Sequence, residues 1–475
     1  MLLALLMTMT LDLPRCMGGN ADAPDALRRA ALAVGLRGEG MLRVRGWRAT
    51  VNDFQSDRSY QPFFSSFQSL ETFFDARGGG LATRVRGGAY PGFESQGSPF
   101  LQLSGPWASW VIRDTLVRAA GTGADARPLD PHAVLADFIA DRSVTVRGSC
   151  PYRDYPRIGL VRRGVYGDEL LLLDQKTHVP VALLREEPHF LWGQVAVEYV
   201  WSNWDLVDNR GGLFPQTAFR VVDSVTILSN TVTTAARVPA DSAPRLALPD
   251  TAWRAPLVDP FFAPRAPDTV RVSDNTWLLV NPSYTITVTL LRDTVFVLDA
   301  TLGETRARQD ADWVARLFPG THPVVLVVTD LAWPHIAGVR YWVASGATVV
   351  SHRAARPFLE RVVNRRWTRE PDLLEQRRAR ARLRFRPVTD SLRLAGGELV
   401  LHAIDGVASE VALMAWLPGE RYLWPGDYIQ NTRQPTGYAS EVLAAVRRLG
   451  LAPERFAAQH VALTPWSTIE GLFVH

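Results

Sequence analysis

The chain has 475 residues, 47% of them hydrophobic and 21% charged, which is typical of a globular protein with two or three domains. Nearly all of the positive charge behind the net +4 and the pI of about 9.2 is arginine, and Lys176 is the only lysine. We interpret this as compositional bias and expect no nucleic-acid partner, because no concentrated basic face is predicted. The two cysteines, Cys16 and Cys150, exclude a disulfide framework and a cysteine-based zinc site, and we expect no single bridge.

The chain opens on an apolar run, MLLALLMTMTLDLPRC. Its length fits the core of a secretory signal better than a membrane-spanning helix, although a basic flank is missing. We take residues 1–18 as a candidate signal segment, which predicts a periplasmic or secreted protein; otherwise the protein is cytoplasmic. Pro14 and Arg15 stand where a lipid-anchored Cys16 would need small residues. No later stretch is long and apolar enough to span a bilayer.

Residues 19–236 are predicted to form a β-rich N-terminal domain. Alternating apolar and polar residues, separated by glycines, indicate strands in hairpin order. The expected strands lie in 41–51, 68–76, 81–90, 143–150, 159–187, 193–222 and 224–235, and the expected helices in 23–35 and 132–141. Long strands with few helices favour a curved antiparallel sheet or half-barrel.

Residues 237–268 are rich in proline and alanine, and we interpret them as a linker. Beyond it, strands and helices alternate through residues 269–475, and several strand pairs are hairpins. The Arg-rich stretch 365–386 has a spacing that suits a solvated helix. This pattern predicts an α/β fold, a four-layered αββα sandwich.

Five segments of this C-terminal half resemble the metallo-β-lactamase-fold metallohydrolases, in the family's order. They are VFVLDATLGE (295–304), VVTDLAWPHIAGVRYWVASGATVVSH (327–352), IDGVASEVALMAWLP (404–418), YLWPGDYIQ (422–430) and AAQHVALTPW (457–466). The second resembles the family's His-x-His-x-Asp-His turn, but in degenerate form. The resemblance implies the family fold and two zinc ions that activate a shared water.

Carried over position by position, the first ion would be held by Asp330, Ala332, Val407 and the bridging Asp427. Alanine and valine coordinate nothing, so the resemblance implies that this ion is lost. Two neighbouring residues, His402 and Asp405, are weaker candidates for rebuilding it. Strand alternation would place Asp405, and not His402, on the same face as position 407.

The second ion would be held by Pro334, His335, His460 and Asp427. Only the proline cannot coordinate, so two histidines and a carboxylate remain for one zinc, iron or manganese ion, with Asp330 as a further candidate ligand. In the alternative interpretation the histidines are ordinary interior residues and the aspartates cap turns. If they share an ion, the side chains of His335, Asp427 and His460 must converge within roughly 5 Å of a common point.

The N-terminal half resembles, more faintly, a curved-sheet lipoprotein-carrier domain, through LLLLDQKTHVPVAL and VAVEYVWSNWDLVDNRGGLFPQTAFRV. Its concave face would take an apolar ligand or pack on the other domain. Its aromatic residues, Trp192, Tyr199, Trp201 and Trp204, are expected to be core. Three functions remain open: a single-metal hydrolase of an ester, amide or phosphoester with Asp427 as general base, an inactive binding or scaffolding module, and a lipid or lipoprotein carrier. The substrate and the oligomeric state are not indicated.

Overall fold

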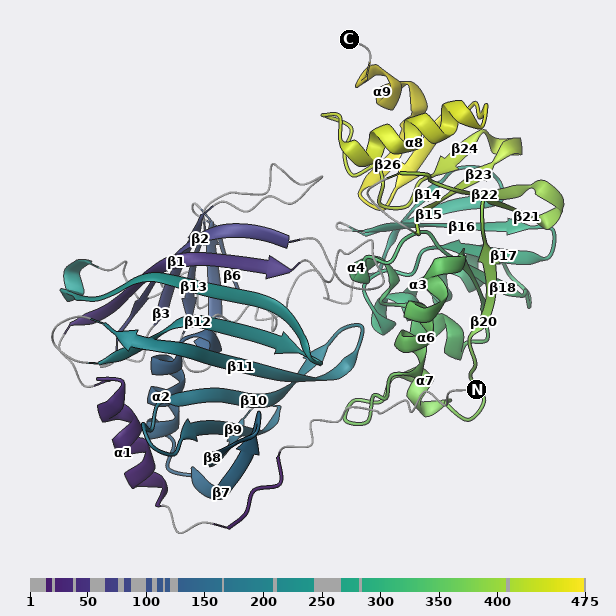
Figure 1. Ribbon diagram of the computed structural model, residues 1–475. Coiled ribbons are helices and arrows are strands. Elements are labelled where there is room, and N and C mark those ends of the chain that lie inside the picture. Colours follow the sequence, from purple (N-terminus) through teal and green to yellow (C-terminus); the bar gives the residue numbers. More distant parts are fainter. Residues whose placement is uncertain are drawn as a thin grey trace. The chain divides into compact units, whose positions relative to one another are not determined.

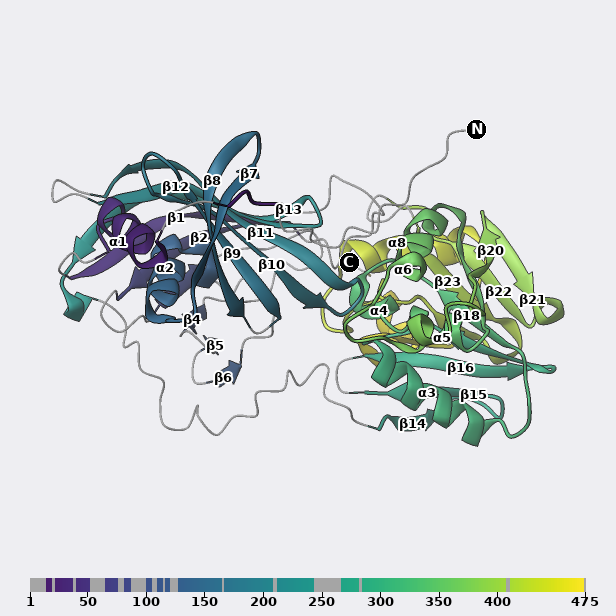
Figure 2. The same cartoon turned by 90° about the horizontal axis from the view of Figure 1, so that it is seen from below.

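The computed structural model describes residues 14–18, 22–36, 40–51, 65–75, 81–86, 100–104, 109–113, 116–119, 127–164, 166–207, 212–242, 266–281, 284–406 and 411–473. They fall into two compact units, drawn in Figures 1 and 2. The C-terminal unit comprises residues 190–193 and those from 266 onward, and the N-terminal unit comprises the rest. Residues 1–13 of the candidate signal segment and 243–265 of the predicted linker lie outside the described residues.

The N-terminal unit is built on one large sheet whose paired strands run antiparallel, as predicted. In sheet order its strands are β6 (Leu116–Ala119), β5 (Ser109–Arg113), β4 (Phe100–Ser104), β3 (Leu81–Arg86), β2 (Ser65–Phe74), β1 (Met41–Val51), β13 (Val225–Val238), β12 (Leu213–Val222), β11 (Gly193–Leu206), β10 (Pro180–His189), β9 (Gly167–Asp174), β8 (Tyr155–Gly164) and β7 (Thr145–Tyr152). Figure 2 shows that this sheet is curved.

Two helices, α1 (Ala23–Ala33) and α2 (Pro131–Ala140), accompany this sheet. The start of α2 is fixed by its N-cap, Asp130, whose carboxylate accepts hydrogen bonds from two backbone N–H groups of the first turn. From β11, the indole of Trp201 donates to the backbone oxygen of Leu129, just before α2, over 3.2 Å. The face that carries Trp201 is therefore the one that α2 covers.

A disulfide joins Cys16 to Cys150, so the prediction that no single bridge forms is wrong. Met17 and Ser149 exchange two backbone hydrogen bonds of 2.8 Å, which place the N-terminal segment beside β7. A sequence separation of 134 residues gives no local signal for this contact, because only the folded sheet brings the two segments together. The Cys16 sulfur is thus bonded within the chain.

The C-terminal unit contains two sheets. The first holds β14 (Asp268–Arg271), β15 (Thr276–Val280), β16 (Thr285–Leu291), β17 (Thr294–Leu298), β18 (Val324–Val328), β19 (Thr348–His352) and β20 (Arg384–Val388), antiparallel up to β17 and parallel from there. The second holds β21 (Ser391–Leu394), β22 (Leu399–Ala403), β23 (Leu413–Leu417), β24 (Tyr422–Trp424), β25 (Arg455–Ala458) and β26 (Val461–Pro465), with only β24 and β25 parallel. The unit is therefore a mixed α/β structure.

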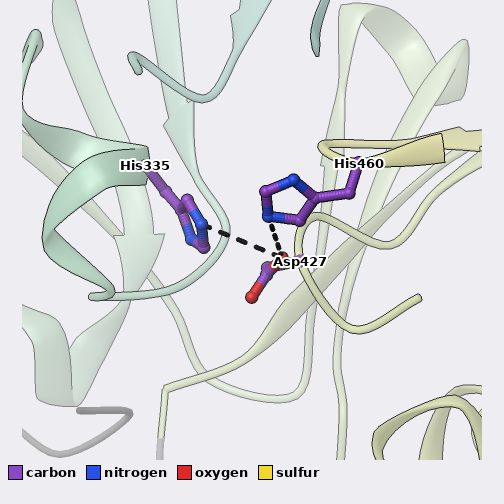
Figure 3. A group of neighbouring side chains, drawn as sticks. All are labelled: His335, Asp427 and His460. Atoms are coloured by element: carbon purple, nitrogen blue, oxygen red, sulfur yellow. Dashed lines mark ion pairs between the residues drawn. The ribbon is translucent and has the colours of Figure 1, made fainter. Parts of the chain in front are cut away.

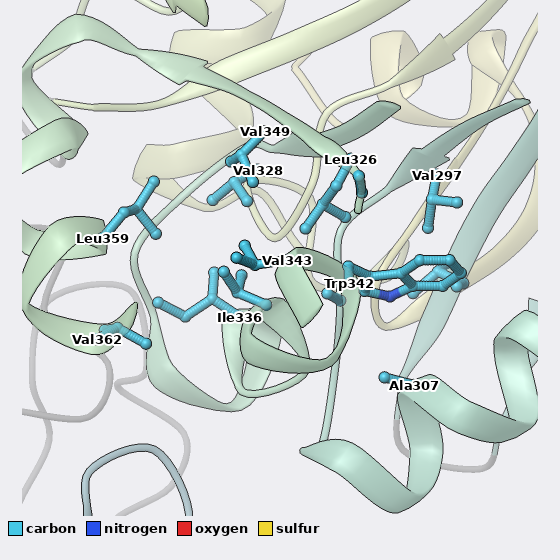
Figure 4. Close-up of a cluster of buried hydrophobic side chains, with 14 of the residues drawn as sticks. Val297, Ala307, Leu326, Val328, Ile336, Trp342, Val343, Val349, Leu359 and Val362 are labelled. Atoms are coloured by element: carbon cyan, nitrogen blue, oxygen red, sulfur yellow. The ribbon is translucent and has the colours of Figure 1, made fainter. Parts of the chain in front are cut away.

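The first sheet is buried on both faces, because alternate residues of its strands serve two cores. In β18, Leu326 and Val328 join a cluster with the helices, whereas Val327 joins a cluster that also contains residues of the second sheet, such as Leu413 and Trp424. Figure 4 shows part of the first cluster. Its helices are α3 (Glu304–Leu317), α4 (Trp333–Ile336), α5 (Val339–Ala344), α6 (Arg356–Asn364) and α7 (Leu373–Gln376). In Figure 1, α8 (Gly437–Arg448) and α9 (Trp466–Gly471) lie at the opposite end of the unit from α6 and α7.

The Arg-rich stretch 365–386 is not the predicted solvated helix. It contains only the single turn α7 and the start of strand β20. From Arg384 onward the chain is extended, because β20 pairs in parallel with β19 and adds a strand to the sheet. Within the described residues, no helix is long and apolar enough to cross a membrane.

Candidate metal centre

The three candidate ligands come from turns that follow strands of the C-terminal unit (Figure 3). His335 lies in α4, the short helix after β18; Asp427 follows β24; and His460 occupies the turn between β25 and β26. β18 and β24 each end in a turn that the sequence marks with polar residues. The segments that carry the ligands meet in space: the backbone N–H of Gln459, before His460, donates to the oxygen of Gly426, before Asp427, over 3.1 Å. Side chains that are distant in sequence therefore lie close together.

One ligand atom from each of these residues lies within 4.8 Å of the other two, so they converge as the single-ion hypothesis requires. The Oδ1 atom of Asp427 is 3.1 Å from Nε2 of His460 and 3.8 Å from Nε2 of His335. Two atoms bound to one zinc ion by bonds of about 2.1 Å can be at most about 4.2 Å apart. The two pairs that include Asp427 meet this limit, and all three ligand atoms lie within 4.8 Å of one another, so the two imidazoles need at most a small approach to share an ion.

Two atoms that face each other across this centre have no hydrogen-bond partner within the described part of the chain: Nε2 of His335 and Oδ1 of Asp427. The His335 side chain is 1% exposed and that of Asp427 is 15% exposed, so water does not readily satisfy them. A buried unpaired polar atom is costly, and a metal ion between these atoms would remove that cost. The donor set of two imidazoles and one carboxylate fits a single divalent ion.

Asp330, predicted as a further ligand, stands behind His335 and is not a member of the converging group. Its Oδ1 accepts a hydrogen bond from the backbone of Ala332 over 2.7 Å and lies 3.0 Å from Nδ1 of His335. With Nδ1 engaged, the other imidazole nitrogen, Nε2, faces Asp427. Asp330 thus orients the ring, as carboxylates behind metal-bound histidines commonly do.

The charges of the centre act on one another strongly. Burial by itself would lower the pKa of His335, but the carboxylates of Asp427 and Asp330 outweigh it and raise that pKa to about 9. Burial would raise the pKa of Asp427, but the imidazoles of His335 and His460 outweigh it and lower that pKa. Asp427 is therefore ionised at neutral pH, as a metal ligand must be.

Two contributors were not predicted as site residues. Gln430 donates a 2.7 Å hydrogen bond to Oδ2 of Asp427 and so leaves Oδ1 directed at the histidines. Asp299, at the end of β17, accepts hydrogen bonds from Thr329, just before Asp330, and from the indole of Trp424. Burial, followed by the charge of Asp330, raises the pKa of Asp299 to about 6. Its position directly after the apolar run of the VFVLDATLGE segment was the available signal.

The other polar or motif residues considered from the sequence do not contribute a ligand to this centre. Ala332 is the N-cap of α4, and Pro334 stands in its first turn, where a proline is tolerated. His352 caps the turn that follows β19 by accepting a hydrogen bond from Ala354. His402 and Asp405 join no candidate metal group in the described residues, and Val407 lies outside them.

An aromatic side chain closes one side of the centre. The ring of Tyr284 lies 5.4 Å from that of His335 and 4.8 Å from that of His460, centroid to centroid. Tyr284 is buried, whereas 30% of the His460 side chain is exposed. Solvent therefore reaches the centre from the His460 side.

No family model and no curated protein matches this chain. Solved structures that resemble it in part include the metallo-β-lactamases TMB-1 (12% identity, TM-score 0.34) and DIM-1 (10%, 0.35), each matched over 44% of this chain and 95% of its own. A metallo-beta-lactamase from Hirschia baltica matches with 10% identity over 44% of this chain and 96% of its own, with a TM-score of 0.34. The case for a metal site rests on the geometry above.

Proposed function

We propose that the C-terminal unit is a metallo-β-lactamase-like domain with the four-layered αββα sandwich. The order of the five sequence segments supports this, as do two sheets that share one core and carry helices. Within this frame, we infer that the site binds one divalent metal ion, zinc in the first instance. The observation that carries the inference is the pair of buried facing atoms that make no hydrogen bond, Nε2 of His335 and Oδ1 of Asp427, with Nε2 of His460 3.1 Å from the same Oδ1.

A zinc ion at such a site supplies Lewis acidity and lowers the pKa of a coordinated water. The chain's own residues supply position and charge. Asp330 fixes the His335 ring, and Gln430 holds Oδ2 of Asp427. Of the two Asp427 oxygens, Oδ1 is the one left for coordination or for accepting a proton. We propose hydrolysis of an ester, amide or phosphoester, which enters from the side of His460.

Metal content tests the proposal. The parent protein, dialysed against buffered zinc, should hold near one equivalent of metal by mass spectrometry, and the His335→Ala, His460→Ala double variant should hold almost none. A matched control replaces two histidines of the same unit outside the centre, His322→Ala and His352→Ala, and should keep the metal. Equal metal in the parent and the site variant, or none in either, would contradict the proposal.

An inactive binding module is the second candidate function. It is favoured by two positions of the resembling turn that cannot coordinate a metal ion: Ala332 is the N-cap of α4, and Pro334 stands in its first turn. Assays of the zinc-loaded protein with p-nitrophenyl acetate, an activated anilide and bis-p-nitrophenyl phosphate separate the two. Turnover that disappears in the Asp427→Asn variant supports the hydrolase, and bound metal without turnover supports the module.

We further propose that the protein works outside the cytoplasm. The Cys16–Cys150 disulfide supports this, since such bonds persist mainly in oxidising compartments. Thiol titration of protein isolated from the periplasm or medium, with and without reductant, should show two thiols only after reduction. Free thiols in the unreduced protein would contradict it.

A further inference from the structure

A buried arginine of the N-terminal unit has no counterion among the residues that the structure describes. Arg48, on β1, is 7% exposed, and within these residues its one hydrogen bond runs from Nε to the amide oxygen of Asn230 over 3.1 Å. Its two terminal nitrogens donate to no acceptor in the described residues. These nitrogens are not fully enclosed by the protein, so a ligand can reach them. Burial lowers the pKa of Arg48 to about 10, so the group remains charged at neutral pH.

Strand pairing shows which face of the sheet Arg48 occupies. It lies opposite Asn230 on β13, which lies opposite Ala218 on β12, which lies opposite Trp201 on β11. Residues directly opposite each other in antiparallel strands share a face. Arg48 therefore belongs to the face of Trp201, the one that α2 covers.

The same face carries other charged residues, and these are paired. Glu187 binds Arg185 and Arg220 over 2.7 Å each and accepts a hydrogen bond from Tyr199. Glu169 binds Arg162 over 2.7 Å and Arg185 over 3.3 Å. We call the five residues Arg162, Glu169, Arg185, Glu187 and Arg220 the buried charge ladder. Together with Arg48, this ladder contains four guanidinium groups and two carboxylates. Three of the four belong to the paired residues, and Arg48 is the one that contacts neither carboxylate.

We propose that Arg48 and Asn230 form a binding site for an oxyanion, a carboxylate or phosphate group of a ligand of the N-terminal unit. The terminal nitrogens of a guanidinium form a planar fork that matches two oxygens of such a group. The Asn230 amide orients the fork by holding Nε. Gln68, opposite Arg48 on β2 and only half-buried, offers a further amide beside it.

Bound ligand should stabilise the folded protein, because it satisfies donors that folding has taken from water. The probes are sodium acetate for the carboxylate and inorganic phosphate, each compared with chloride at constant ionic strength, on the full chain. One of them should raise the unfolding midpoint of the N-terminal unit in a saturable way, and the probe that does so identifies the oxyanion.

Arg48→Gln should abolish the response, and Arg48→Lys should weaken the apparent affinity roughly tenfold, since the charge stays but the fork is lost. The control Arg45→Gln removes the same charge from the exposed face of the same strand, where Arg45 pairs with Glu71, and should leave the response intact. In chloride, Arg48→Gln should unfold no earlier than the parent, because an uncompensated buried charge is gone.

Three results would overturn the proposal. The parent responds to neither probe; Arg48→Gln responds as the parent does; or Arg48→Gln unfolds much earlier in chloride while the parent shows no saturable response, which leaves Arg48 a structural role only.

Discussion

Two buried groups of charges, one in each unit, are held in different ways, although the C-terminal unit also contains compensated pairs such as Arg306–Asp310 and Arg340–Asp372. In the N-terminal unit, Glu169 and Glu187 are each held between arginines, so both carboxylates are compensated by direct contacts. In the C-terminal unit, His335 and Asp427 face each other at 3.8 Å without a hydrogen bond. A buried ion pair in direct contact needs no further partner. Two buried polar atoms that face each other without a hydrogen bond are stabilised when a third group binds both. On the function proposed above, the first group serves the fold and the second serves a ligand.

Glu187→Gln should have the largest effect on stability. It removes the carboxylate that Arg185 and Arg220 each contact at 2.7 Å, while Arg185 keeps Glu169 at 3.3 Å, and removal of one partner of a buried pair costs about 3–5 kcal/mol. Urea unfolding of the N-terminal unit should show this loss, and metal binding should not change. Glu186→Gln, on the opposite face of the same strand, is the control. If Glu187→Gln lost no more stability than the control, the buried charge ladder would have no role in stabilising the fold.

Asp330→Asn should weaken metal binding about 10–100-fold, the usual effect of altering a group that orients a metal-bound histidine. The loss is measured by competition with a chelator, and the unfolding of the N-terminal unit should stay the same. The control Asp312→Asn changes an exposed carboxylate of α3 in the same unit. Unchanged affinity in Asp330→Asn would mean that His335 is oriented by its packing alone.

The pH dependence of unfolding should distinguish the parent from Glu187→Gln. Burial would raise the pKa of Glu187, but Arg185 and Arg220 outweigh it and hold that pKa below its ordinary value of 4.5. An acid with a lowered folded-state pKa contributes stability above about pH 4.5 and loses it as the pH falls through the folded value. The stability gap between parent and variant should therefore be constant near neutrality and shrink below pH 4.5. A gap that widens in acid would contradict this sign.

Asp168→Asn should have the smallest effect, less than about 0.5 kcal/mol, because exposed ion pairs contribute little. Asp168 pairs with Arg163 at 3.0 Å in the same sheet as Glu187, but both side chains are largely exposed. Urea unfolding of this variant beside Glu187→Gln compares an exposed with a buried carboxylate. Equal losses of unfolding free energy in the two variants would show that burial does not determine how much these ion pairs stabilise the protein.

Local patterns in the sequence predicted much of the fold. The period-2 alternation in 193–222 indicated β11 and β12, and the apolar run before Asp330 indicated β18. The prediction of a helix in the Arg-rich stretch was wrong, because closely spaced arginines indicate only a solvated surface. Such a surface occurs on a helix and on an edge strand alike. The disulfide escaped prediction, because the distance along the chain between Cys16 and Cys150 contains no information about their distance in space.

The sequence by itself determined the local elements and the residue types that a metal ion would need, because periodicity and side-chain chemistry are properties of short segments. It named His335, Asp427 and His460 but could not place them together. Only the tertiary structure decided that they converge, that Asp330 stands behind His335, and that Arg48 meets no carboxylate in the described part of the chain. These are contacts between distant strands and turns, and they depend on strand register and sheet packing, which no short segment specifies.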